Sequence, residues 1–73
     1  MNKEFIEKIA KNIRKLREEK GLTQLELALE IGVTPGAIGN LEIAKNDTSL
    51  SRLYDIAKAL GVEPYELLIF KDE

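Results

Sequence analysis

The sequence predicts an all-α fold of five short helices packed around one core. Three observations lead to this class. Apolar residues recur at intervals of three and four, as they do on one face of a helix. Capping residues such as Thr23, Thr34 and Ser49 precede these stretches, and glycines follow several of them. No stretch alternates between apolar and polar residues as a half-buried strand would.

The first two helices have clear starts and stops. Asn2 is expected to cap the first helix, and Gly21 to end it in the left-handed conformation. The run Thr23-Gln24-Leu25-Glu26 predicts a capping box, in which the Thr23 hydroxyl and the Glu26 carboxylate each accept a backbone N–H. Gly32 is expected to end the second helix.

The third helix is expected to start at Thr34-Pro35 and to run to Ala44, about residues 35–44. Two helices that meet across a short turn containing glycine are typical of a helix-turn-helix. A fourth helix is predicted between Ser49 and Gly61, and a fifth from Pro64 to about Phe70. The predicted core consists of Ile9, Ile13, Leu16, Leu27, Ala28, Ile31, Val33, Ile38, Leu41, Leu53, Ile56, Ala57 and Leu60.

Length and composition restrict the function. With 73 residues the chain has the size of one small domain, residues 1–73. The sequence contains no histidine and no cysteine, so the usual zinc sites and histidine-based triads cannot form. We therefore expect no enzyme, no metal and no cofactor. Since no signal-peptide pattern or long apolar run is visible, a cytoplasmic location is expected.

A family resemblance rests on residues that agree in register from about residue 9 to residue 68. They include Leu22-Thr23-Gln24, Leu27-Ala28, Ile31-Gly32-Val33-Thr34, Leu41-Glu42 and Ile56-Ala57-Lys58-Ala59-Leu60-Gly61-Val62. This pattern resembles the phage-repressor/Cro-type (XRE-like) helix-turn-helix family. The ending Gly61-Val62-Glu63-Pro64-Tyr65-Glu66-Leu67-Leu68 is also similar to the controller proteins of restriction–modification systems.

The resemblance implies a small dimeric transcriptional regulator that binds double-stranded DNA, with the third helix in the major groove. It implies an ion pair between Arg17 and Glu42 that ties the first helix to the third. The implied base-reading positions are Thr34, Pro35, Gly36, Ala37 and Asn40. The implied phosphate-contacting positions are Thr23, Gln24, Arg14, Arg17, Lys45 and Asn46. Among the base-reading positions, Asn40 has the amide suited to a bidentate contact with adenine.

Some residues depart from the family pattern. Residues 21–44 carry three glutamates and no lysine or arginine, although DNA-binding domains are usually basic. Leu25 and Leu29 stand at positions that are usually polar, either as scattered surface residues or as a partner-contact patch. Ala44 stands where glycine is common, so the third helix is expected to end differently. These features keep open an alternative function: an antitoxin-like or partner-binding interaction module with weak or no DNA binding.

Surplus apolar residues near both ends of the chain predict a further contact. The run Leu67-Leu68-Ile69-Phe70 has four apolar residues, more than one helix face can bury, and Phe5 at the other end lies beyond the family core. The expected contact residues are Phe5, Leu67, Ile69 and Phe70. They either form a satellite cluster within the monomer or a two-fold homodimer interface. Palindromic operators favour the homodimer.

Overall fold

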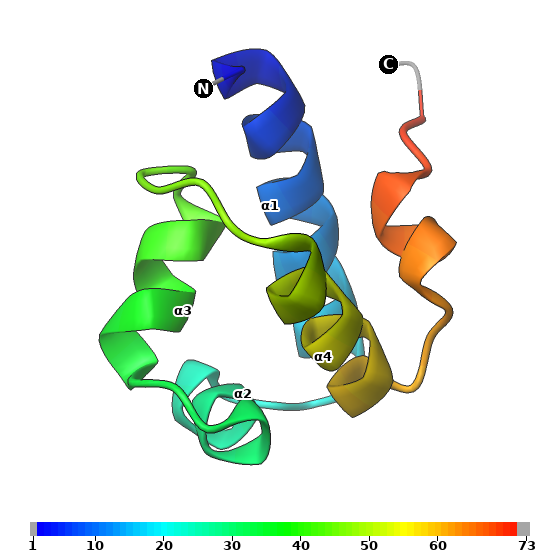
Figure 1. Cartoon of the computed structure of the whole chain (residues 1–73). Coiled ribbons are helices and arrows are strands. Elements are labelled where there is room, and N and C mark those ends of the chain that lie inside the picture. The colour runs from blue at the N-terminus through cyan, green and yellow to red at the C-terminus, as the bar shows by residue number, and fades with distance from the viewer. Residues whose placement is uncertain (1, 72–73) are drawn as a thin grey trace.

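The computed structural model describes residues 2–71 and contains four α-helices followed by a 3-10 helix. They are α1 (Lys3–Glu19), α2 (Gln24–Ile31), α3 (Pro35–Glu42), α4 (Leu50–Leu60) and η1 (Pro64–Leu68). In Figure 1, α1 and α4 lie between α3 on one side and η1 on the other, while α2 closes one end. The predicted all-α class is confirmed for the described part of the chain.

The predicted helix starts are confirmed. The side chains of Asn2, Thr23, Thr34 and Ser49 each accept the backbone N–H of the residue three positions later, at 3.0–3.2 Å. The capping box of α2 is complete, because the Thr23 N–H donates to a carboxylate oxygen of Glu26 at 2.8 Å. These contacts satisfy N–H groups that have no partner within the helix.

The predicted extent of the third helix is wrong by two residues, since α3 ends at Glu42 rather than at Ala44. Ala44 itself takes the left-handed conformation, with φ of 57°. This geometry lets the Lys45 N–H donate to the Asn40 carbonyl at 2.9 Å, which closes the helix end. The Ala44 methyl is buried in a small cluster with Ile6 and Ala10, and this packing offsets backbone strain that a glycine would avoid.

The core agrees with the predicted set. Ile9, Ile13, Leu27, Ala28, Ile38, Leu41, Ile56, Ala57 and Leu60 are buried together, and the other predicted members, Leu16, Ile31, Val33 and Leu53, pack against them half-buried. One further residue, Leu67, is only 1% exposed and belongs to the same core. The predicted place of Leu67 in a dimer interface is therefore wrong, because its side chain is already covered within the monomer.

The prediction of a fifth helix up to Phe70 is also wrong. The chain forms one 3-10 turn and becomes extended at Ile69. Asn12 explains the change, since its side-chain amide donates to the carbonyls of Leu67 and Ile69, both at 2.9 Å. A continuing helix would use those carbonyls internally. Phe70 then meets the Phe5 ring edge-on, with 5.8 Å between ring centroids.

Candidate nucleic-acid interface

The connection between α2 and α3 is three residues long, from Gly32 to Thr34. Gly32 adopts φ of 75°, which turns the chain sharply after α2. Ile38 and Leu41 are buried and hold the inner face of α3 against the core. The opposite face of α3 is thereby presented outward. This arrangement is a helix-turn-helix.

The five positions predicted to read bases lie at the start and along the outer side of α3. Thr34, Pro35 and Gly36 are exposed, whereas Ala37 and Asn40 are half-buried. The Thr34 hydroxyl accepts the Ala37 N–H, so it is committed to capping as an acceptor. Within residues 2–71, the side-chain amide of Asn40 makes no hydrogen bond, and it remains available to an outside ligand.

A buried ion pair fixes α3 against α1. Arg17 Nε donates to Glu42 Oε2 at 2.7 Å, and a second guanidinium nitrogen donates to Glu42 Oε1 at 3.0 Å. The exposed fraction of the two side chains is only 10% for Arg17 and 2% for Glu42. Hydrogen bonding to Glu42 raises the pKa of Arg17, so the guanidinium stays charged. The predicted Arg17–Glu42 pair is confirmed.

The same geometry contradicts a phosphate-contacting role for Arg17. Its third nitrogen donates to the Leu22 carbonyl at 2.7 Å, so all of its nitrogens face partners inside the protein. Gln24 joins this network, because its side-chain amide donates to Glu42 Oε1 at 3.0 Å. The side-chain N–H of Gln24 is therefore directed across to α3. Its backbone N–H lies in the first turn of α2, where such groups lack a partner within the helix.

The remaining basic and polar positions are exposed. Lys45 and Asn46 lie in the loop that follows α3. Arg14 lies on α1, one turn before Arg17, and its Nε is 3.3 Å from a carboxylate oxygen of Glu18.

Leu25 and Leu29 on α2 are 51% and 71% exposed, so the predicted exposure of this pair is confirmed.

Comparison with known proteins decides the family. The helix-turn-helix family model matches residues 13–67, which is most of the chain. This chain belongs to the XRE/Cro-like helix-turn-helix family. An HTH-type transcriptional regulator of Methanothermobacter thermautotrophicus is 46% identical over 61 residues, covering 84% of this chain and 88% of the relative. One from Sinorhizobium fredii is 37% identical over 65 residues, covering 89% and 84%.

A solved helix-turn-helix structure is also similar. The restriction-modification controller protein C.AhdI from Aeromonas hydrophila superimposes with a TM-score of 0.82 at 35% identity, covering 85% of this chain and 94% of its own. The relatives are transcriptional regulators rather than enzymes. Within residues 2–71, no group of three metal-binding side chains comes together. No helix of that part is long and apolar enough to cross a membrane.

Sequence reasoning missed four exposed apolar side chains on α4 and η1. Leu50 and Tyr54 on α4 are 85% and 51% exposed, and Tyr65 and Leu68 on the adjacent η1 are 64% and 45% exposed. The spacing of four between Leu50 and Tyr54 is a signal that was available, because it places both residues on one helical face away from Ile56 and Leu60.

Proposed function

We propose that residues 1–73 form one DNA-binding domain that binds double-stranded DNA in a sequence-specific manner as a dimeric transcriptional regulator. The outward face of α3 carries this proposal, because α3 is held rigidly by the Arg17–Glu42 pair while its outer side remains uncovered. In the proposed complex α3 lies in the major groove, and Thr34, Pro35, Gly36, Ala37 and Asn40 meet the base edges.

Phosphate binding is proposed for the rim of this face. The N-terminus of α2 offers the N–H of Gln24 and the positive end of the helix dipole, next to the Thr23 hydroxyl. Lys45 and Asn46 bind phosphate from the loop after α3, and Arg14 does so from α1. Because only Arg14 and Lys45 are cationic here, we expect modest affinity with a shallow salt dependence.

Variants of Asn40 and Lys45 distinguish base recognition from phosphate binding. Asn40→Ala is expected to lower operator affinity by about 1–3 kcal/mol per half-site and to relax preference at one adenine. Lys45→Ala is expected to weaken operator and random duplexes alike, and to flatten the log–log salt slope by about one unit for each phosphate that is no longer neutralised. Selection from a random duplex library supplies the operator, and titrations at several salt concentrations supply the affinities.

Lys15→Ala on α1 is the control for removal of positive charge, because Lys15 is exposed and lies on the side of α1 that faces η1 rather than α3. It should leave both affinities unchanged. The reverse pattern, with Lys45→Ala altering specificity and Asn40→Ala silent, would mean that another surface meets the DNA.

A homodimer is proposed to place two copies of α3 on successive half-sites. Of the predicted interface residues, Leu67 is buried, and Phe5 and Phe70 pack against each other as the satellite cluster left open by the sequence. Ile69 is 52% exposed and lines a groove beside α1 together with Lys8, Lys11, Lys15 and Lys71. The exposed apolar residues Leu50, Tyr54, Tyr65 and Leu68 offer a better self-complementary surface, so we propose the dimer contact there.

Tyr54→Glu tests this interface. Burying the added charge against a second copy is unfavourable, so we expect the dimer dissociation constant to rise at least about tenfold. Leu29→Glu is the matched control, since Leu29 is also exposed to solvent but lies on α2. Sedimentation at several concentrations measures the change. A dimer that persists in Tyr54→Glu but dissociates in Phe70→Glu would indicate that the interface is formed by Phe5 and Phe70 instead.

A protein-interaction module is the second candidate function. The exposed pair Leu25 and Leu29, flanked by Glu26 and Glu30, favours it, because this acidic apolar surface repels DNA phosphates. Absence of binding to random duplex at low salt would support this candidate over the first. The likeness to C.AhdI leads us to propose control of a restriction–modification system as one setting for the regulator.

A further inference from the structure

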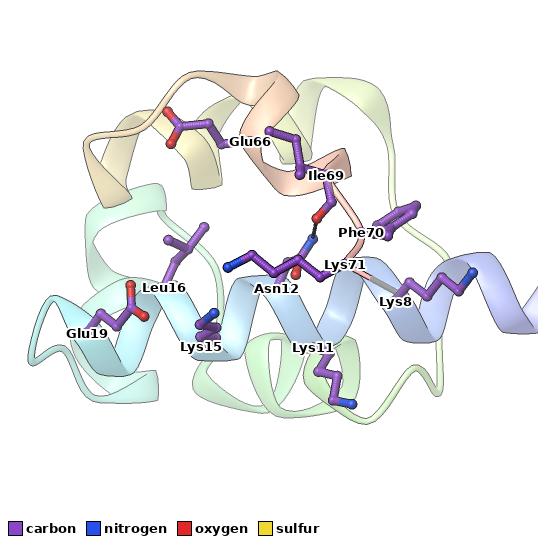
Figure 2. A pocket seen from close by; sticks show the side chains of 10 residues that line it. All are labelled: Lys8, Lys11, Asn12, Lys15, Leu16, Glu19, Glu66, Ile69, Phe70 and Lys71. Atoms are coloured by element: carbon purple, nitrogen blue, oxygen red, sulfur yellow. Dashed lines mark hydrogen bonds between the residues drawn. The ribbon is translucent and has the colours of Figure 1, made fainter. Parts of the chain in front are cut away.

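A groove of about 680 Å³ lies between α1 and the extended end of the chain (Figure 2). Lys8, Lys11 and Lys15 line it from α1, and Lys71 lines it from the opposite wall. Glu19 and Glu66 are its only acidic lining residues among those described, so four positive charges meet two negative ones. The groove is therefore basic, although the chain as a whole has a net charge of −2.

The charges are unevenly placed along the groove. Figure 2 shows Glu19 and Glu66 toward the end where α1 terminates, and Lys8 at the other end. Lys8 is 4.0 Å from a Glu4 carboxylate oxygen and 5.6 Å from the centre of the Phe70 ring. Within residues 2–71, Lys11, Lys15 and Lys71 form no ion pair. These three cations of the described chain thus border the groove without an acidic partner.

The groove is also preformed and partly apolar. Asn12 lies at its centre and fastens the extended segment by donating to the carbonyls of Leu67 and Ile69. Leu16, Ile69 and Phe70 add apolar surface to the walls. Because the groove is already formed, ligand binding requires less ordering of the protein and costs less conformational entropy than binding to a flexible surface. The combination of apolar walls and surrounding lysines selects a ligand with both apolar and anionic groups.

Neither a second copy of the chain nor operator DNA fits this groove well. A second copy joined by a two-fold axis would bring the same lysines against themselves, which is repulsive. Operator DNA bound along α3 lies on the other side of the molecule, because α1 separates α3 from η1 (Figure 1). The lysines of the groove therefore neither close the dimer nor hold the operator.

We propose that this groove binds an extended acidic segment of a partner protein. An apolar side chain of the segment packs on Leu16, Ile69 and Phe70, while its carboxylates pair with Lys11, Lys15 and Lys71. Binding on this side leaves α3 free, so one molecule can hold DNA and the partner together. The interaction is charge-dependent and weakens as salt is raised.

The test uses a short fluorescent peptide rich in aspartate and glutamate around a central Leu-Phe pair. Its anisotropy is titrated with the full chain and with Lys15→Glu/Lys71→Glu, whose dissociation constant should rise at least about tenfold because like charges now meet. Arg52→Glu/Lys58→Glu on α4 changes the net charge by the same amount outside the groove, so it is the matched control and should bind the peptide as tightly as the unaltered chain. A peptide with Ser-Ser in place of Leu-Phe should bind more weakly.

Three results would overturn the proposal. In the first, the peptide shows no saturable binding. In the second, Arg52→Glu/Lys58→Glu weakens peptide binding as much as the groove variant does, which would show that the peptide is attracted to positive charge in general. In the third, the groove variant no longer binds random duplex, which would make the groove a nucleic-acid surface. Retained duplex binding together with abolished peptide binding supports the proposal, and it does so whether or not α3 reads an operator.

Discussion

Glu42→Ala is expected to remove about 3–5 kcal/mol from the free energy of unfolding, because it leaves the shielded Arg17 charge without its partner. The Arg17 side chain is only 10% exposed, and two of its nitrogens donate to Glu42. Gln24 loses its acceptor in the same variant. Urea denaturation of the variant and the unaltered chain measures the difference.

A double-mutant cycle separates the pair from its surroundings. Arg17→Met/Glu42→Leu should be more stable than either single variant, since apolar side chains of similar size leave no buried charge behind. The exposed pair of Arg14 and Glu18 supplies the control, with side chains 61% and 56% exposed. Its coupling should be about 0.2–1 kcal/mol. Equal coupling in the two cycles would show that burial does not strengthen the Arg17–Glu42 interaction.

The double variant Arg17→Met/Glu42→Leu also tests the role of the ion pair in DNA binding. The hydrogen bonds among Arg17, Gln24 and Glu42 connect α1, α2 and α3. This network therefore sets the angle at which α3 packs on the other two helices. If the rigid outer face of α3 carries recognition, Arg17→Met/Glu42→Leu should have reduced operator affinity even where its stability is restored. Random-duplex affinity, which depends on the rim of the site, should change less.

Helix boundaries were predictable because their causes are local. Each cap bonds an amide three residues away, and Gly21, Gly32 and Gly61 take positive φ at the stops. The end of α3 was harder to predict, since Ala44 adopts a glycine-like conformation and its methyl is buried against Ile6 and Ala10. That packing joins positions that are 38 and 34 residues apart in the sequence.

The site was predictable in its positions but less so in its bonding. A family pattern places Arg17 and Glu42 as a pair, yet it cannot show that Leu22 and Glu42 together occupy every nitrogen of Arg17. This burial is the reason that Arg17 cannot serve phosphate binding. In the same way, the groove beside α1 depends on the Asn12 side chain, which donates a hydrogen bond to the Leu67 carbonyl 55 positions away.

Leu67→Ala should cost about 2–5 kcal/mol of unfolding free energy, because it empties a fully buried site. Leu67 is 1% exposed and packs in the core, where η1 meets α1 and α4. Sequence periodicity could not separate Leu67 from its apolar neighbours, since a 3-10 turn has three residues per turn and then gives way to extended chain. A large loss of unfolding free energy is therefore expected from the burial of Leu67 in the structure and not from the sequence pattern.

Leu29→Ala on α2 is the control, since this leucine is 71% exposed, lies outside both the core and the proposed dimer contact, and should cost less than about 1 kcal/mol. Denaturation at two protein concentrations distinguishes the core from a dimer interface. A core residue gives the same destabilisation at both concentrations, whereas a weakened subunit interface would give one that changes with concentration through mass action. A small destabilisation of Leu67→Ala that changes with protein concentration would indicate that Leu67 lies in the subunit interface, and η1 would then have to pack differently.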